Sequence, residues 1–218
     1  MPIEIRYTTL GIAATNAYLV ADSETKEAIL IDPVDQPESL YQMAAEAGWT
    51  IKLIVATHAH FDHVLASKGL KALTGAPFWI HGEAVPMLNN LPDQGLRFTG
   101  QRFPEAAQPD RLLTSESESI EVGAIRLETR YTPGHAPGHL SLFMPAQKIV
   151  FSGDALFAGS IGRTDLPGGS HPLLMESIFT QLLTLPDDTT VLPGHGEATT
   201  IAHERQYNPY IQAYRPSP

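Results

Sequence analysis

The 218-residue chain contains no cysteine. This absence excludes a disulfide framework, a thiolate metal site and a cysteine nucleophile. Any metal that the protein binds must therefore be held by histidine, aspartate or glutamate side chains.

Basic residues are also scarce. Lys and Arg number 14 against 24 Asp and Glu, which gives a formal net charge of −10. A chain with this balance has no broad attraction for phosphate backbones or anionic membranes. We therefore expect a small-molecule substrate and neither a nucleic-acid nor a membrane partner, while the composition leaves the oligomeric state open.

Long hydrophobic runs are missing as well. No apolar run approaches the ~18 residues of a membrane span, and the N-terminus lacks the basic region and apolar core of a signal peptide. A cytoplasmic protein is therefore expected. With 43% hydrophobic and 17% charged residues, the chain is predicted to form a single compact domain over residues 1–218.

Hydrophobic patterning predicts a mixture of strands and helices. Two segments rich in Pro and Gly, 89–109 and 155–170, are expected to be long loops, and the first is long enough to act as a lid. Helices are predicted over 38–47, 64–73 and from Pro172 onward. Strands are predicted over 17–20, 28–31, 51–56, 78–80, 118–122, 124–131, 141–144, 148–151 and 190–192.

The strongest chemical signal is the segment Thr57-His58-Ala59-His60-Phe61-Asp62-His63, which follows a buried strand. It holds four potential metal ligands within six residues. Residues i and i+2 of an extended segment face the same way, and a tight turn into a helix can bring i+4 and i+5 back toward one point. One loop can therefore supply ligands to two adjacent metals.

Three more potential ligands also follow predicted strands. His135 ends a Thr-Pro-Gly-His segment, Asp154 ends Phe-Ser-Gly-Asp, and His195 ends Leu-Pro-Gly-His. Sheets build sites where strands end, because rigid strands hold the loops that carry the ligands. Spacing alone leaves each of the three open between a metal ligand and a structural residue.

Taken in order, these motifs resemble the metallo-β-lactamase superfamily, and within it the glyoxalase II (hydroxyacylglutathione hydrolase) group. The resemblance runs from Asp32 to His195. It implies a mixed α/β fold, the four-layer αββα sandwich, and two divalent metals, zinc first, with iron or manganese as alternatives. The implied ligands of one metal are His58, His60, His135 and Asp154, and those of the other are Asp62, His63, His195 and the bridging Asp154.

Differences from the motifs of other subgroups of this superfamily exclude some of them. A His at His60, where the flavodiiron type has Glu, argues against that type, and the absence of cysteine excludes the β-lactamase classes with a Cys ligand. Only 23 residues follow His195, so the chain resembles the short glyoxalase II form, without the C-terminal helical domain of the longer form.

Weaker assignments concern four other residues. The segment around Gly162-Arg163-Thr164-Asp165 resembles short glyoxalase II-like proteins and the related persulfide dioxygenases, so Arg163 is expected either to bind a substrate carboxylate or to pair with Asp165. Asp32 is expected to orient a ligand or to cap a turn. His139 is expected to line the pocket or to hold a structural hydrogen bond.

The metal set implies a mechanism. Two divalent ions share a water, lower its pKa and polarise a carbonyl, so that a metal-bridging hydroxide, oriented by the catalytic Asp62, attacks a glutathione-type thioester such as S-lactoylglutathione. A mononuclear iron persulfide dioxygenase is the main alternative, because His58, His135 and Asp154 alone form a two-His, one-carboxylate triad. Hydrolysis of a lactone or another ester on the same scaffold is a further alternative.

Overall fold

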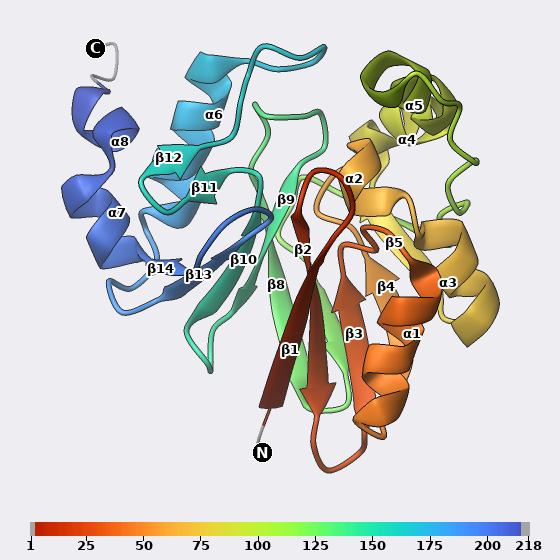
Figure 1. Cartoon of the computed structure of the whole chain (residues 1–218). Helices are drawn as coiled ribbons and strands as arrows, with labels where there is room; N and C mark the ends of the chain where they lie inside the picture. Colours follow the sequence, from red (N-terminus) through yellow and green to blue (C-terminus); the bar gives the residue numbers. More distant parts are fainter. Residues whose placement is uncertain (1–2, 215–218) are drawn as a thin grey trace.

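The protein is described by a computed structural model that covers residues 3–214. Two six-stranded sheets form its centre, and helices cover their outer faces (Figure 1). The first sheet follows chain order: β1 (Ile3–Leu10), β2 (Thr15–Asp22), β3 (Glu27–Ile31), β4 (Thr50–Val55), β5 (Phe78–His81) and β6 (Arg111–Leu113). Strands β1 to β3 pair antiparallel, and β3 to β6 pair parallel.

The second sheet has the order β14-β13-β10-β9-β8-β7. Strands β13 and β10 are parallel, and every other pair is antiparallel. Its strands are β7 (Ser119–Val122), β8 (Ile125–Tyr131), β9 (Leu140–Met144), β10 (Ile149–Gly153), β13 (Thr190–Pro193) and β14 (Thr199–Thr200). A separate small hairpin joins β11 (Leu156–Phe157) to β12 (Ser160–Ile161).

The helices divide between the two outer faces. The first sheet carries α1 (Pro37–Glu46), α2 (Phe61–Val64), α3 (Ser67–Thr74), the short 3-10 turn η1 (Gly82–Ala84), α4 (Val85–Asn89) and α5 (Leu91–Thr99). The second carries α6 (His171–Ser177), its π-helical continuation η2 (Ile178–Leu182), α7 (Ile201–Tyr207) and α8 (Pro209–Ala213).

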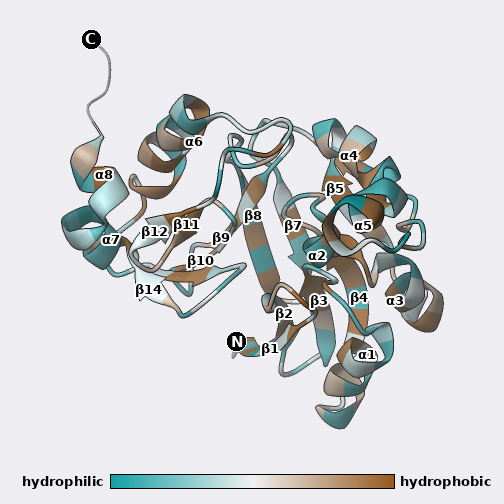
Figure 2. Cartoon of the chain, turned by 45° about the horizontal axis from the view of Figure 1, so that its top comes forward, coloured by the Kyte–Doolittle hydropathy of each residue, from teal (hydrophilic) through white to brown (hydrophobic). Residues whose placement is uncertain are grey.

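Strand periodicity explains the layers. Along β3, Ala28 and Leu30 pack in the cluster beneath α1 and α3, whereas Ile29 and Ile31 pack in the cluster between the two sheets. Successive strand side chains point to opposite faces, so a strand that is apolar throughout belongs to a sheet covered on both sides. In Figure 2 hydrophobic colour predominates along β3 and β4, while the helices carry hydrophobic and hydrophilic residues together. The predicted αββα sandwich is therefore confirmed.

The predicted strands are all present, but several helix predictions need correction. Segment 89–109 is not irregular throughout, since it contains α5. Its Pro92 lies at the start of the helix, where the missing N–H costs nothing. Its Gly95 lies so close to Phe103 that a Cβ would come within 2.6 Å of the ring. Proline and glycine usually disfavour a helix, but the structure accommodates both residues at these positions.

Other boundaries also differ from the prediction. Helix 64–73 divides into α2 and α3, and the helix from Pro172 becomes π-helical at Ile178. Strand β1, strand β6 and the helices α7 and α8 were not predicted. In residues 155–170 the expected loop contains the small β11–β12 hairpin.

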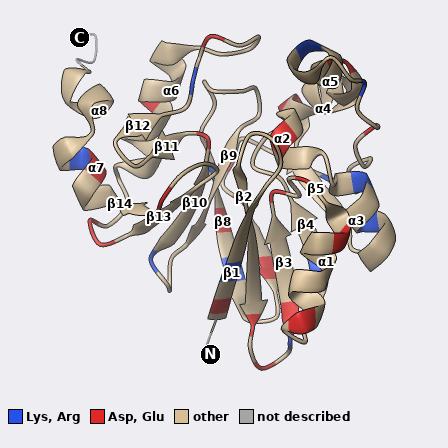
Figure 3. Ribbon diagram, viewed as in Figure 1, with Lys and Arg blue, Asp and Glu red and all other residues tan. Residues whose placement is uncertain are grey.

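Two surface properties bear on partners. Within the described range 3–214, no helix is both long and apolar enough to cross a membrane. In the view of Figure 3, Lys and Arg residues are spread over several elements, and α3 carries both Lys68 and Lys71.

Replacing Leu30 by Ala tests the packing of the central strand β3. Leu30 is fully buried, so the lost contacts and the resulting cavity are expected to lower the free energy of unfolding by about 2–5 kcal/mol. The matched control is Leu112→Ala on β6, because the Leu112 side chain is 52% exposed and its loss is expected to cost under ~0.5 kcal/mol. Urea denaturation measures both, and equal losses would contradict the assignment of Leu30 to the core.

Candidate metal centre

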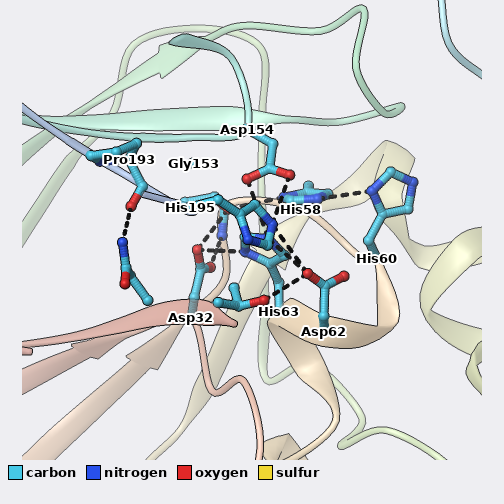
Figure 4. Close-up of polar contacts among 12 residues, drawn as sticks. Asp32, His58, His60, Asp62, His63, Gly153, Asp154, Pro193 and His195 are labelled. Atoms are coloured by element: carbon cyan, nitrogen blue, oxygen red, sulfur yellow. Dashed lines mark hydrogen bonds and ion pairs between the residues drawn. The ribbon is translucent and has the colours of Figure 1, made fainter. Parts of the chain in front are cut away.

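Potential ligands from distant parts of the chain meet at one edge of the sandwich, where the two sheets adjoin (Figure 4). Each follows the end of a strand. Asp32 follows β3, the segment 57–63 follows β4, His135 follows β8, Asp154 follows β10, and His195 follows β13. The strands themselves are rigidly paired, so the loops hold these side chains in fixed relative positions.

The segment 57–63 has the conformation that its spacing predicts. His60 is extended, with φ −66° and ψ 148°, and helix α2 begins at the next residue. His58 and His60 therefore project from extended backbone, while Asp62 and His63 lie in the first helical turn. One short loop presents all four side chains to the same space.

The donor atoms form three overlapping groups, and within each group they lie within 4.8 Å of one another. The groups are His58 with His60 and His135, His58 with His63 and Asp154, and Asp62 with His63 and His195. Asp154 lies between the first and third groups: its Oδ2 is 3.4 Å from Nε2 of both His135 and His195, and its Oδ1 is 3.3 Å from His63 Nε2. This position is the one expected of a bridging carboxylate.

Hydrogen bonds fix which ring nitrogen faces the centre. His63 Nδ1 donates to Asp32 Oδ2 at 2.9 Å, and His135 Nδ1 donates to the Arg163 carbonyl at 2.7 Å. In each ring the proton is therefore on Nδ1, and the lone pair of Nε2 is available to bind a cation. The backbone of Arg163 therefore orients His135, a role that its side chain does not suggest.

Asp32 organises the ligand loop through both of its oxygens. Oδ1 accepts the Thr57 N–H at 2.7 Å, and Oδ2 accepts both the Thr57 hydroxyl at 2.9 Å and His63 Nδ1–H. Its φ of 57° lies in the left-handed region, which Asp tolerates better than most residues. The structure thus shows Asp32 hydrogen-bonded to His63, the arrangement that the orienting role requires if His63 binds a metal.

His139 is fully buried and lies beneath Asp154. Its Nε2 accepts the Asp154 backbone N–H at 3.0 Å, so its proton is on Nδ1, which donates to Thr132 Oγ1 at 2.8 Å. His139 therefore fixes the backbone of Asp154 and does not line the pocket. This is the structural hydrogen bond that was one of its two expected roles.

Close packing around Asp154 requires glycine at Gly194. A Cβ there would lie 2.2 Å from Asp154 Oδ1 and 2.7 Å from His63 Cε1. The Leu-Pro-Gly-His segment thus needs its glycine because the carboxylate occupies the space of a side chain.

Two residues that the sequence did not single out support Asp62 and the seam between the sheets. Thr15 Oγ1 donates to Asp62 Oδ2 at 2.7 Å. Asn16 Nδ2 donates to the Pro193 carbonyl at 3.0 Å and the Gly196 carbonyl at 3.1 Å, which ties β2 to the loop of His195. The sequence indicates them only as two polar residues at the start of β2, a strand that the structure buries along its whole length.

Gln94 is a third residue that sequence reasoning did not select. It is 7% exposed, and its Nε2 donates to the Ala59 and Met87 carbonyls while its Oε1 accepts the Phe61 N–H. Helix α5 is therefore attached directly to the ligand loop.

Burial and charge divide the site into two parts. Burial lowers the pKa of His60 to about 3 and that of His58 well below its usual range. Burial would also lower the pKa of His195, but its hydrogen bonds with Asp154 and Asp62 raise it to about 10. Burial would raise the pKa of Asp62, but His63 and His195 hold it at about 2. The site thus offers neutral imidazoles at His58 and His60 and ionised carboxylates at Asp62 and Asp154, while His195 holds a proton that a bound metal would displace, because ligation requires a neutral imidazole.

The donor set fits divalent metals. Among the described residues, His63 Nε2 and Asp154 Oδ1 are buried without a hydrogen-bond partner, and both face the centre. A buried polar atom without a partner is costly, and a cation removes that cost. Imidazole and carboxylate donors suit zinc and iron.

The Arg163 side chain lies at the edge of this space. It lines a cavity of about 260 Å³ together with His60, Asp62, His135, Asp154 and His195. Its guanidinium forms a bidentate pair with Asp165, at 2.7 Å for both bonds. The pairing alternative is therefore the one observed, at a position that also borders the cavity.

Comparison with known proteins identifies similar sequences along nearly the whole chain. Residues 10–195 match the family model of the metallo-beta-lactamase superfamily. The hydroxyacylglutathione hydrolase GloC of Haemophilus influenzae is 39% identical, with 91% of this chain and 93% of that protein covered. The human mitochondrial persulfide dioxygenase ETHE1 is 33% identical, with 96% of this chain and 76% of that protein covered.

Solved structures agree in fold. The B3 metallo-beta-lactamase BLEG-1 superposes with a TM-score of 0.91 at 37% identity, covering 96% of this chain and all of that one. TTHA1623 in a di-iron-bound form superposes with a TM-score of 0.84 at 38% identity, covering 94% of this chain and 99% of that one.

Replacing Asp32 by Asn tests its support of the ligand loop. Asn tolerates the left-handed backbone but presents no second carboxylate oxygen to His63. Metal affinity is expected to fall about 10–100-fold, as for other supporting carboxylates. Metal content and a competitive chelator titration measure the change, with Asp188→Asn at an exposed ion pair as the control. Unchanged affinity in the Asp32 variant would remove the orienting role.

Proposed function

Because the chain belongs to the metallo-β-lactamase superfamily, we propose that it is a dinuclear metal-dependent hydrolase of glutathione-type thioesters. The main support for this proposal is that seven potential ligand side chains converge on one centre, with Asp154 between two groups of imidazoles. The proposed ligands are His58, His60, His135 and Asp154 for one metal, and Asp62, His63, His195 and Asp154 for the other. Residues 1–218 are proposed to act as one domain, since both sheets contribute to the hydrophobic layer between them.

Two divalent metals bound at this centre would lower the pKa of a water between them and polarise the substrate carbonyl. Asp62 orients that water, because its Oδ2 faces the centre and is fixed by the Thr15 hydroxyl. Asp154 stays ionised, since burial alone would raise its pKa but His63 and His195 lower it well below its usual range. The protein residues thus position the attacking water, and the metals would supply its activation.

Bond changes in the reaction are simple. A C–O bond forms to the carbonyl carbon, the C–S bond breaks, and water supplies the oxygen, giving a carboxylate, a thiol and one proton. A thiol has a pKa of about 8.5, so its thiolate leaves without a dedicated acid. The site therefore needs no separate proton donor.

The similarity to GloC supports the thioester substrate, since that relative is a hydroxyacylglutathione hydrolase aligned over 93% of its length. Zinc is the proposed metal, and iron is the alternative favoured by the di-iron form of TTHA1623.

A second candidate is persulfide dioxygenation. It is favoured by the similarity to ETHE1. In addition, His58 shares one donor group with His135 and another with Asp154, and His135 Nε2 lies 3.4 Å from Asp154 Oδ2, so two imidazoles and one carboxylate lie close together. That reaction consumes O2, whereas hydrolysis does not, so oxygen dependence separates the two. Ester or lactone hydrolysis would use the same water and the same residues.

Anaerobic turnover of S-lactoylglutathione tests the proposed function. The metal-loaded protein is expected to hydrolyse the thioester at the same rate with and without O2, followed by loss of thioester absorbance. Asp62→Asn is expected to lower kcat by about 10²-fold, because the attacking water is no longer held in position. Turnover of a persulfide that stops without O2, together with an inert thioester, would instead establish the dioxygenase.

Replacing Arg163 by Ala tests whether it binds the thiol part of the substrate. If the guanidinium exchanges Asp165 for a glutathione carboxylate, KM is expected to rise about tenfold for a glutathione thioester and to change little for a neutral thioester. Asp165→Asn is the control, because it removes the internal pair and keeps Arg163. Equal changes for both substrates would mean that Arg163 serves only the loop.

A further inference from the structure

A groove of about 540 Å³ leads away from the candidate metal centre. Helices α4 and α5 form one wall, and the segment that precedes α6 forms the other; these elements lie at the same edge of the molecule in Figures 1 and 2. The residues that line it are His60, Pro86, Met87, Asn90, Asp93, Gln94, Arg97, Phe98, Pro137, Leu166, Pro167 and Gly168.

The groove is continuous with the catalytic space. His60, Phe98 and Leu166 line both the groove and the smaller cavity that contains the proposed ligands. His60 Nδ1 lies 3.0 Å from His58 Nε2 and 2.8 Å from His135 Nε2, so one edge of this ring belongs to the centre while the residue also borders the groove. A substrate whose carbonyl lies at the centre can therefore extend one substituent past His60.

The wall formed by α5 is held in place. Gln94 joins the helix to segment 57–63 with two hydrogen bonds and to α4 with a third, and the Phe98 ring stacks on Phe61 with centroids 5.4 Å apart. A groove attached to the ligand loop in this way is largely formed before a substrate arrives, which reduces the ordering cost of binding.

The lining is mainly apolar. Met87, Phe98, Pro137, Leu166 and Pro167 supply hydrocarbon surface. The amide of Gln94 is already fully hydrogen-bonded, and Asp93 pairs with Arg102 at 3.6 Å. Arg97 is exposed and lies over the Phe98 ring at 5.8 Å. Polar groups thus lie at the rim or are already satisfied, and an apolar substituent suits the interior.

The volume is larger than a lactoyl group needs. Pockets of about 300–1,000 Å³ accommodate ligands of drug size, whereas a two- or three-carbon acyl group would leave most of this groove empty. Arg163 lies beside His135 and His195 in the smaller cavity and is absent from the groove lining. The proposed thiol position and the groove are therefore different exits from one centre.

We propose that the groove binds the acyl group, and that the preferred substrates are thioesters of apolar acyl groups of several carbons. This inference rests on the proposed thioester hydrolysis and adds the substrate class. Each methylene buried in an apolar site contributes about 0.8 kcal/mol, which is about fourfold in affinity or in kcat/KM.

The test compares S-acetyl-, S-butanoyl- and S-hexanoylglutathione, which share one thiol. For the metal-loaded protein, kcat/KM is expected to rise about fourfold per methylene. Met87→Trp is expected to fill the groove and bring the hexanoyl-to-acetyl ratio of kcat/KM close to one, while Met87→Leu, of similar volume, keeps the ratio. Asn90→Trp, at an exposed position on the same lining, fills the groove without disturbing the core.

Two results would overturn the proposal: a wild-type ratio near one with clear turnover, or a high ratio that persists in both Trp variants. Binding of S-hexyl- and S-methylglutathione, measured by calorimetry, supplies a readout that needs no hydrolysis. If no thioester is hydrolysed but S-hexylglutathione binds far more tightly, and less so in the Trp variants, the thioesterase proposal fails and the apolar groove stands. Equal binding of the two thioethers would also contradict the proposal that the groove binds an apolar substituent.

Discussion

The burial of Asp154 among imidazoles is the constraint on which the rest of the site depends. An ionised carboxylate that is 6% exposed is stable only when charges and hydrogen bonds compensate for lost hydration. His63, His135 and His195 surround its oxygens, and His139 accepts its backbone N–H. Each imidazole must therefore be oriented, and the supporting hydrogen bonds around the site follow from that need.

That orientation comes from both halves of the chain. The Asn16 amide and the Tyr18 hydroxyl of the first sheet donate to the Pro193 carbonyl of the second, at 3.0 and 2.7 Å. The Leu140 N–H in turn donates to the Thr57 carbonyl at 2.8 Å. The centre exists only when the two sheets are docked, so the energy that packs the inner hydrophobic layer also positions the ligands.

The candidate metal centre and the neighbouring groove are built on different kinds of elements. The ligands follow paired strands, whereas the groove is made by short helices and a loop, which accept changes in side chain without disturbing the sheets. Gln94 is the connection between the two parts. Such a division lets one scaffold serve hydrolases and oxygenases, consistent with the similarity to both GloC and ETHE1.

The local features of this protein could be predicted from its sequence. Period-two patterning identified the buried strands, and the spacing within 57–63 predicted a loop able to present four donors, because both depend on neighbouring residues. Helix α5 was not predicted, because a glycine inside a helix lowers its stability. Glycine is needed at Gly95 because Phe103, eight residues later, occupies the space that a side chain would fill. The partners of Asn16, Gln94 and Asp154 lie far away along the chain. Only the tertiary structure decided those contacts, because long-range packing selects them and local sequence does not encode which distant atoms will meet.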